Sequence, residues 1–212
     1  MKRLALPFIA LLLAACTTQS GSATPSTSST ASPSLSAAPS SSAGAWIIPD
    51  EPTGPALAGD PVNASDTDGV FTLLLEAEQD RYRAGQPLGI DASLTYSGPD
   101  DEITALGSGS GLIGFSVQRT SPAITISAVS TSDCRPYQLT RDAPVAYPFI
   151  KSGGFSADDP QASFYEAYFA DEQLRLPAGE WTISAGGSFY SGGDCGDDLH
   201  ELTASVTIIV EP

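Results

Sequence analysis

Near the C-terminus, apolar side chains occupy every second position: Leu202, Ala204, Val206, Ile208 and Val210. Successive side chains of a β-strand point to opposite faces, so a strand places all five on one face. A helix would scatter them around its axis, because its period is 3.6 residues. A strand with one apolar face buries that face against a second layer. This segment therefore predicts a sheet that is covered on one side.

The same two-residue period recurs through most of the chain after residue 70, and segments rich in glycine, proline and aspartate interrupt it. Apolar residues alternate at 71–77, 88–96, 113–117, 124–128 and 181–185. Short alternating segments with turns at this spacing are typical of two packed sheets. We expect an all-β fold, an antiparallel β-sandwich of seven to nine strands over residues 70–212.

The segment Leu-Pro-Ala-Gly-Glu-Trp, residues 176–181, leads into a late strand. With the strand pattern of residues 70–211, it resembles the immunoglobulin-like domains of bacterial extracellular proteins. The resemblance implies an immunoglobulin-like sandwich. Cys134 and Cys195 depart from the usual immunoglobulin pairing, which joins an early strand to a late strand around a core tryptophan.

Residues 162–169 are rich in aromatic side chains and fit two patterns. Phe164 with Tyr168, and Tyr165 with Phe169, have helical spacing, and Pro160 is well placed to begin a helix. Aromatic residues are equally typical of strands, and the surrounding segments are β. We therefore expect a strand here.

The first fifteen residues have the layout of a secretory signal peptide, with Lys2 and Arg3 before an apolar run at 4–13. That run is too short for a bilayer, which needs about 20 residues. The tetrapeptide Leu-Ala-Ala-Cys at 13–16 resembles the lipobox of bacterial lipoproteins. The resemblance implies that residues 1–15 are removed and that Cys16 carries acyl chains such as palmitate. They would anchor the chain to the extracytoplasmic face of the cell membrane.

Residues 17–45 contain 16 serine or threonine residues and no charge, and Leu35 is their only bulky apolar side chain. Such a composition cannot bury enough apolar surface to offset the entropy cost of ordering. We therefore expect a disordered tether over residues 16–45. Residues 46–69 contain four prolines, and we expect an extended lead-in that docks on the domain as an edge strand.

The net charge of the chain is −16 at pH 7, and it becomes −18 without Lys2 and Arg3, which precede every acidic residue. Such a surface repels the phosphates of nucleic acids and anionic lipid head groups. Nucleic acid is therefore excluded as a partner. Cationic peptides, Ca²⁺ and neutral ligands remain compatible with this charge.

The chain has three cysteines, Cys16, Cys134 and Cys195. If Cys16 carries lipid, Cys134 and Cys195 remain to form a bond with each other. An even pair in an oxidising compartment predicts a disulfide. Its closed loop of roughly 60 residues would contribute on the order of 4 kcal/mol to stability by the chain-entropy argument. A reduced buried pair or a metal site are the alternatives.

His200 is the only histidine and lies in register with Leu202, at the edge of the core face. A secreted serine hydrolase would have to use it, with Asp197 or Asp198 as its partner, but no G-x-S-x-G segment is present. We therefore expect no catalytic residues and no cofactor. A hydrolase using His200 stays open as an alternative.

A glycine-rich loop near the C-terminus collects three carboxylates, Asp194, Asp197 and Asp198. A disulfide between Cys134 and Cys195 would bring Asp133 close to them. Carboxylate oxygens are the ligands that Ca²⁺ prefers, although acidic turns are usually just solvated. A calcium-binding or ligand-capturing lipoprotein is a further alternative. The expectation we favour is a lipid-anchored, extracytoplasmic binding or envelope-associated module for an unknown extracellular ligand.

The N-terminal prediction concerns the covalent state of Cys16. We expect mass spectrometry of the native chain, extracted from bacterial membranes, to find Cys16 as the first residue with two or three acyl chains. A Cys16→Ser variant should keep its leader and carry no acyl mass, because serine lacks the thiol that is alkylated. An unacylated Cys16, or a mature N-terminus upstream of it, would contradict the prediction.

Overall fold

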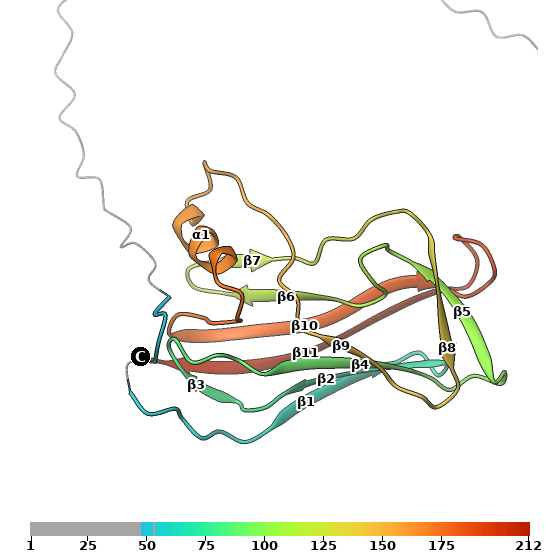
Figure 1. The fold of residues 1–212 in the computed structure, drawn as a ribbon, viewed down its shortest axis with the longest axis horizontal. Coiled ribbons are helices and arrows are strands. Elements are labelled where there is room, and N and C mark those ends of the chain that lie inside the picture. The colour runs from blue at the N-terminus through green and yellow to red at the C-terminus, as the bar shows by residue number, and fades with distance from the viewer. Residues whose placement is uncertain (1–47, 53) are drawn as a thin grey trace, which may run out of the picture. The chain divides into compact units, whose positions relative to one another are not determined.

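The computed structural model describes residues 48–52 and 54–212. The expected signal peptide, Cys16 and the tether lie outside these residues. The described chain forms two β-sheets and one short helix (Figure 1). The all-β class expected from the sequence is confirmed. Within the described residues, no helix has the length and apolar character of a membrane span.

The first sheet has four strands, and every neighbouring pair is antiparallel. Its order is β1 (Val62–Thr67), β2 (Phe71–Ala77), β4 (Ile90–Tyr96) and β9 (Val145–Pro148). β1 is an edge strand, and it lies within the segment that we expected to form an extended lead-in.

The second sheet has seven strands and is antiparallel except where β3 runs parallel to β11. Its main order is β3 (Arg81–Arg83), β11 (Leu199–Glu211), β10 (Gly179–Tyr190), β5 (Glu102–Gly107) and β8 (Arg135–Thr140). β6 (Gly114–Arg119) also pairs with β10, and β7 (Ile124–Ile126) pairs with β6. The described residues thus hold eleven strands, two of them only three residues long.

The two longest strands, β10 and β11, pair over twelve positions, from Gly179 opposite Val210 to Tyr190 opposite Leu199 (Figure 1). Their alternate residues face the core as the sequence period predicts. The buried set on these two strands comprises Trp181, Ile183, Ala185, Phe189, Leu202, Ala204, Val206, Ile208 and Val210. The first sheet supplies the opposite wall through the alternating buried residues of β2 and β4.

The expected strand at 162–169 is wrong, because the structure forms the helix α1 (Ala162–Ala170) there. Phe164, Tyr165 and Tyr168 are all buried. A strand would point Phe164 and Tyr165 to opposite faces, whereas helical spacing brings all three to one side. The Phe164 ring stacks on Trp181 of β10, with centroids 5.7 Å apart. The helix therefore covers an end of the core, and this burial decides between the two patterns.

The end of α1 is held by a cation. Lys151 Nζ donates hydrogen bonds to the carbonyl oxygens of Tyr168, at 2.5 Å, and Asp171, at 2.8 Å. The last carbonyl groups of a helix have no partners within it, and a positive charge there is favourable. Burial nonetheless lowers the pKa of Lys151 to about 8.

The disulfide between Cys134 and Cys195 is present, with the two Cα atoms 6.0 Å apart. It joins the segment 127–134, which connects β7 to β8, to the loop 191–198, which connects β10 to β11. Both cysteines lie in connections rather than in strands, so the bond differs from the usual immunoglobulin disulfide.

The packing of α1 predicts a large cost for removing one aromatic ring. Phe164→Ala should destabilise the fold by about 3–5 kcal/mol, as expected for a fully buried phenylalanine. Glu166→Ala, on the exposed side of the same helix, should stay within about 0.5 kcal/mol. Urea unfolding followed by tryptophan fluorescence measures both. Equal effects of the two substitutions would show that the helix does not belong to the core.

Candidate functional site

A cavity of about 280 Å³ is lined by residues of both sheets. Its lining comes from β9 of the first sheet, from β6 and β10 of the second, and from the connections 108–113 and 127–134. This volume is close to the lower end of known small-molecule sites, about 300–1,000 Å³. The cavity therefore has the size for a small ligand or for one bulky group of a larger one.

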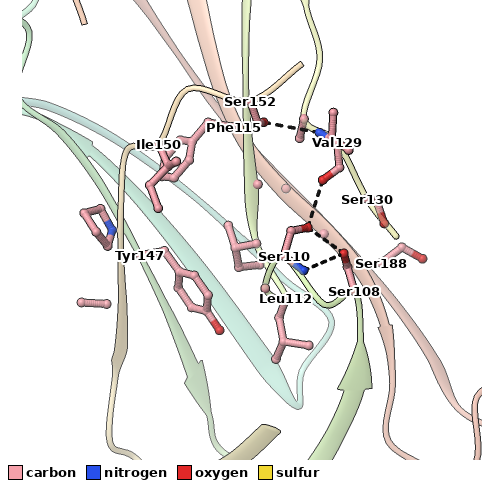
Figure 2. A pocket seen from close by; sticks show the side chains of 18 residues that line it. Ser108, Ser110, Leu112, Phe115, Val129, Ser130, Tyr147, Ile150, Ser152 and Ser188 are labelled. Carbon is pink, nitrogen blue, oxygen red and sulfur yellow. Dashed lines mark hydrogen bonds between the residues drawn. The ribbon is translucent and has the colours of Figure 1, made fainter. Parts of the chain in front are cut away.

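The walls of this pocket differ in chemistry (Figure 2). Tyr147, Ile150 and Phe115 lie on one side, and the hydroxyl groups of Ser108 and Ser110 on the other. The lining residues are Ser108, Ser110, Gly111, Leu112, Ile113, Gly114, Phe115, Ala128, Val129, Ser130, Ala146, Tyr147, Pro148, Ile150, Ser152, Gly186, Gly187 and Ser188. No Asp, Glu, Lys, Arg or His is among them, although the chain as a whole is strongly acidic.

Two of the large apolar residues that the surface exposes belong to this pocket. Ile150 is 67% exposed and Val129 is 52% exposed. Exposed apolar side chains gathered around a concavity commonly mark a place where a ligand is covered. The pocket therefore combines exposed apolar side chains with hydroxyl groups in its lining.

Serine side chains hold one wall of the pocket in place (Figure 2). The hydroxyl of Ser110 donates to the carbonyl of Val129 at 3.0 Å, and the N–H of Val129 lies 3.4 Å from Ser152 Oγ. The N–H of Thr131 donates to Ser108 Oγ at 2.9 Å. Besides the disulfide, the segment 127–134 is thus bound to its surroundings by side-chain hydrogen bonds rather than by a strand ladder.

Three other hydroxyl groups in the lining make no hydrogen bond with the residues that the structure describes: Ser130, Ser188 and Tyr147. Burial, and to a lesser extent the nearby Tyr137, raises the pKa of Tyr147 to about 12. Tyr147 is therefore a neutral phenol at physiological pH. All three groups can both donate and accept a hydrogen bond.

Gly187 on β10 allows the connection 108–113, which lines the pocket, to lie directly against the β10 backbone. A Cβ atom at Gly187 would lie only 2.0 Å from the carbonyl oxygen of Leu112. Real Cβ atoms do not approach this closely, so a larger residue would push the 108–113 connection away from β10. Gly187 therefore sets the position of the serine-bearing wall.

His200 lies elsewhere, in β11, and its side chain is 13% exposed. Its Nε2 lies 2.8 Å from Ser191 Oγ, and its Nδ1 lies 2.6 Å from Asp68 Oδ2. The sequence suggested Asp197 or Asp198 as its partner, but neither is hydrogen-bonded to it in the described structure. The histidine thus bridges the β1–β2 turn and the end of the β10–β11 hairpin.

Asp68 is fixed by the backbone of its own turn. Its Oδ1 accepts the N–H groups of Val70, at 2.9 Å, and Phe71, at 2.8 Å. Burial by itself would raise the pKa of Asp68, but these hydrogen bonds and His200 outweigh it and lower the pKa below the ordinary 3.8. Asp68 is therefore an ionised carboxylate at neutral pH.

The residues predicted to bind calcium do not form a ligand set. Asp194, Asp197 and Asp198 lie in the loop 191–198, and no three metal-binding side chains gather anywhere in residues 48–52 and 54–212. Asp133 directly precedes Cys134 of the disulfide, and Thr131, the N–H of Gly109 and Arg135 all donate to it. These bonds lower the pKa of Asp133 to about 2. Its oxygens already serve a structural role.

Sequence reasoning did not identify Asp68, Ser191 or the pocket residues. Ser191 directly follows β10, opposite the start of β11, so the hairpin register would have brought it near His200. Asp68 lies 132 positions before His200 in the chain, and no local pattern connects the two. The pocket depends on how the two sheets meet, which periodicity does not specify.

No protein-family profile matches the chain, and no curated protein matches its sequence.

The bonds of Asp68 predict an acid-sensitive contribution to stability. Asp68→Asn should lower the free energy of unfolding at pH 7 by about 1.5 kcal/mol, the low end for a hydrogen bond to a charged group. Because the folded pKa is depressed, this stability is present above pH 3.8 and is lost as the pH falls through the lower folded value. The difference in the free energy of unfolding between wild type and Asp68→Asn should therefore become smaller as the pH is lowered towards 2.

Urea unfolding at pH 7 and at acid pH measures this difference. The exposed Asp158→Asn is the matched control and should change stability little at either pH. A difference between wild type and Asp68→Asn that is the same at both values would contradict the assignment.

Proposed function

We propose that this chain is a lipid-anchored, extracytoplasmic binding module whose β-sandwich takes up a small, neutral and partly apolar ligand. The observation that carries the proposal is the charge-free lining of the pocket on a strongly acidic protein. The expected tether after Cys16 would hold the domain away from the membrane.

The chemistry of the lining selects the class of ligand. A charged group placed in a pocket without an opposite charge loses hydration and gains no partner, which is costly. A neutral molecule avoids that cost, and its apolar part gains from covering Ile150 and Val129. The hydroxyls of Tyr147, Ser130 and Ser188, which make no hydrogen bond with the described residues, can bond to its polar part.

The anchoring half of the proposal rests on the sequence. A basic start, a short apolar run and the Leu-Ala-Ala-Cys segment precede 29 uncharged residues rich in serine and threonine. Two or three acyl chains give stable membrane attachment, because each buried methylene contributes about 0.8 kcal/mol. A binding domain held in this way would sample ligands close to the outer face of the membrane.

Three probes of one shape and different charge test the pocket: benzyl alcohol, benzoate and benzylamine. In a protein-observed NMR titration, benzyl alcohol should shift the resonances of Val129, Tyr147 and Ser188. Benzoate and benzylamine should shift them at least tenfold more weakly, because their charges remain unpaired. Equal binding of all three probes, or binding of none, would refute the proposal.

Tyr147→Phe removes one hydroxyl from the pocket and leaves the ring. We expect it to weaken benzyl alcohol binding by about fivefold, the cost of roughly one neutral hydrogen bond. Tyr190→Phe is the matched control, because Tyr190 does not line the pocket. If both variants bind the probe as tightly as wild type, the hydroxyl has no role in binding.

A further inference from the structure

Asp68, His200 and Ser191 form a continuous hydrogen-bonded line at one end of the β10–β11 hairpin. We propose that this line is a hydrolytic site in which Ser191 is the nucleophile, His200 the general base and Asp68 the residue that orients the imidazole. The substrate class is a neutral carboxylic ester with a short acyl group. This activity goes beyond the binding function and uses none of the pocket residues.

The chemistry of the two hydrogen bonds places the protons. An ionised carboxylate only accepts hydrogen bonds, so Nδ1 of His200 carries the proton that it donates to Asp68 Oδ2 across 2.6 Å. A neutral imidazole has one proton, so Nε2 is then an acceptor. In this neutral tautomer, the hydroxyl of Ser191, whose Oγ lies 2.8 Å from Nε2, is the donor of that hydrogen bond. This is the state in which a histidine can take a proton from serine.

The surroundings hold the imidazole in this orientation. Its ring packs edge-on against Phe71, with centroids 4.6 Å apart, and stacks on Phe189 at 5.5 Å. Asp68 is fixed in turn by the N–H groups of Val70 and Phe71. A base that is locked by packing and by a second hydrogen-bonded group loses little entropy on reaching the reactive geometry.

The nucleophile lies on an accessible loop. Ser191 is partly exposed and is the first residue of the loop 191–198, which the Cys134–Cys195 disulfide ties down. The backbone N–H of Ser191 donates to the carbonyl of Asp198 at 3.2 Å, which fixes the position of the residue. Ser191 does not line the pocket. A long acyl chain would therefore not be covered by that cavity, and we assign a short acyl group to the substrate. Asp194 and Asp197 in the same loop would repel an anionic ester.

The reaction consists of two balanced steps. Ser191 Oγ attacks the carbonyl carbon of the ester while its proton moves to His200 Nε2. The bond from that carbon to the alcohol oxygen breaks, and the alcohol leaves with the proton from Nε2. Water then attacks the acyl-serine and gives its proton to Nε2 in the same way. The carboxylic acid leaves, and the Ser191 hydroxyl is restored.

The backbone around Ser191 sets the expected size of the rate enhancement. The N–H groups of Ser191 and Gly192 donate to the carbonyls of Asp198 and Asp197, so neither is directed at a reacting oxygen. The N–H of Gly193 makes no hydrogen bond with the described residues and is the next donor along the loop. General-base catalysis alone contributes about 10²–10⁴-fold. We expect activity in this range.

Two measurements on the intact protein test the site. A fluorophosphonate probe followed by peptide mass spectrometry should place an adduct on Ser191. Hydrolysis of p-nitrophenyl acetate should exceed the uncatalysed rate by roughly 10²-fold at least. Both signals should vanish in Ser191→Ala, and His200→Gln should lose the adduct as well. Thermal melts show whether each variant is folded. If His200→Gln is unfolded, the comparison of Ser191→Ala with wild type is sufficient to test the site.

Ser184→Ala is the matched control, because Ser184 is a β10 serine whose hydroxyl pairs with Ser205 instead of a histidine. It should keep both the adduct and the activity. The absence of an adduct on Ser191, or hydrolysis that is unchanged in Ser191→Ala, would overturn the proposal. Binding of benzyl alcohol should be the same in Ser191→Ala as in wild type, so the failure of this site is distinct from the failure of the pocket.

Discussion

The pairing of β10 with β11 is the interaction on which the rest of this fold depends. These strands share twelve register positions, and their inward residues form the centre of the second sheet. β3 pairs with the outer edge of β11, and β5 and β6 both pair with β10. Both candidate sites use this hairpin: Gly186 and Gly187 line the pocket, and Ser191 and His200 lie at its closed end.

The two arrangements are built from different kinds of bond. The pocket is walled by neutral hydroxyls and apolar groups, in a protein whose other surfaces are rich in carboxylates. The His200 line is built on one ionised carboxylate that backbone N–H groups hold in place. A neutral cavity suits recognition without charge, whereas an ionised carboxylate held against an imidazole suits proton transfer. The same scaffold therefore presents two chemistries at separate places.

Periodicity was enough to predict the class of fold and most of its strands. Each inward residue that the alternation indicated on β2, β4, β10 and β11 is buried. It failed for α1, because the aromatic spacing there satisfies two periods and only the packing of Phe164 on Trp181 distinguishes them. The disulfide was predicted from the two cysteines that remain beside Cys16 and from the oxidising compartment that the N-terminal segment leads us to expect. The partner of His200 could not be predicted in this way. Asp68 belongs to the β1–β2 turn of the first sheet and meets His200 of β11 only because the two sheets pack together.

The disulfide makes one mechanical unit of two regions that are far apart in the chain. Cys134 ends the segment that forms a wall of the pocket, and Cys195 belongs to the loop that begins with Ser191. The wall is also held by hydrogen bonds that involve serine hydroxyls and the carboxylate of Asp133. If a ligand displaces this wall, the disulfide transmits the displacement to Cys195, which is four residues from Ser191.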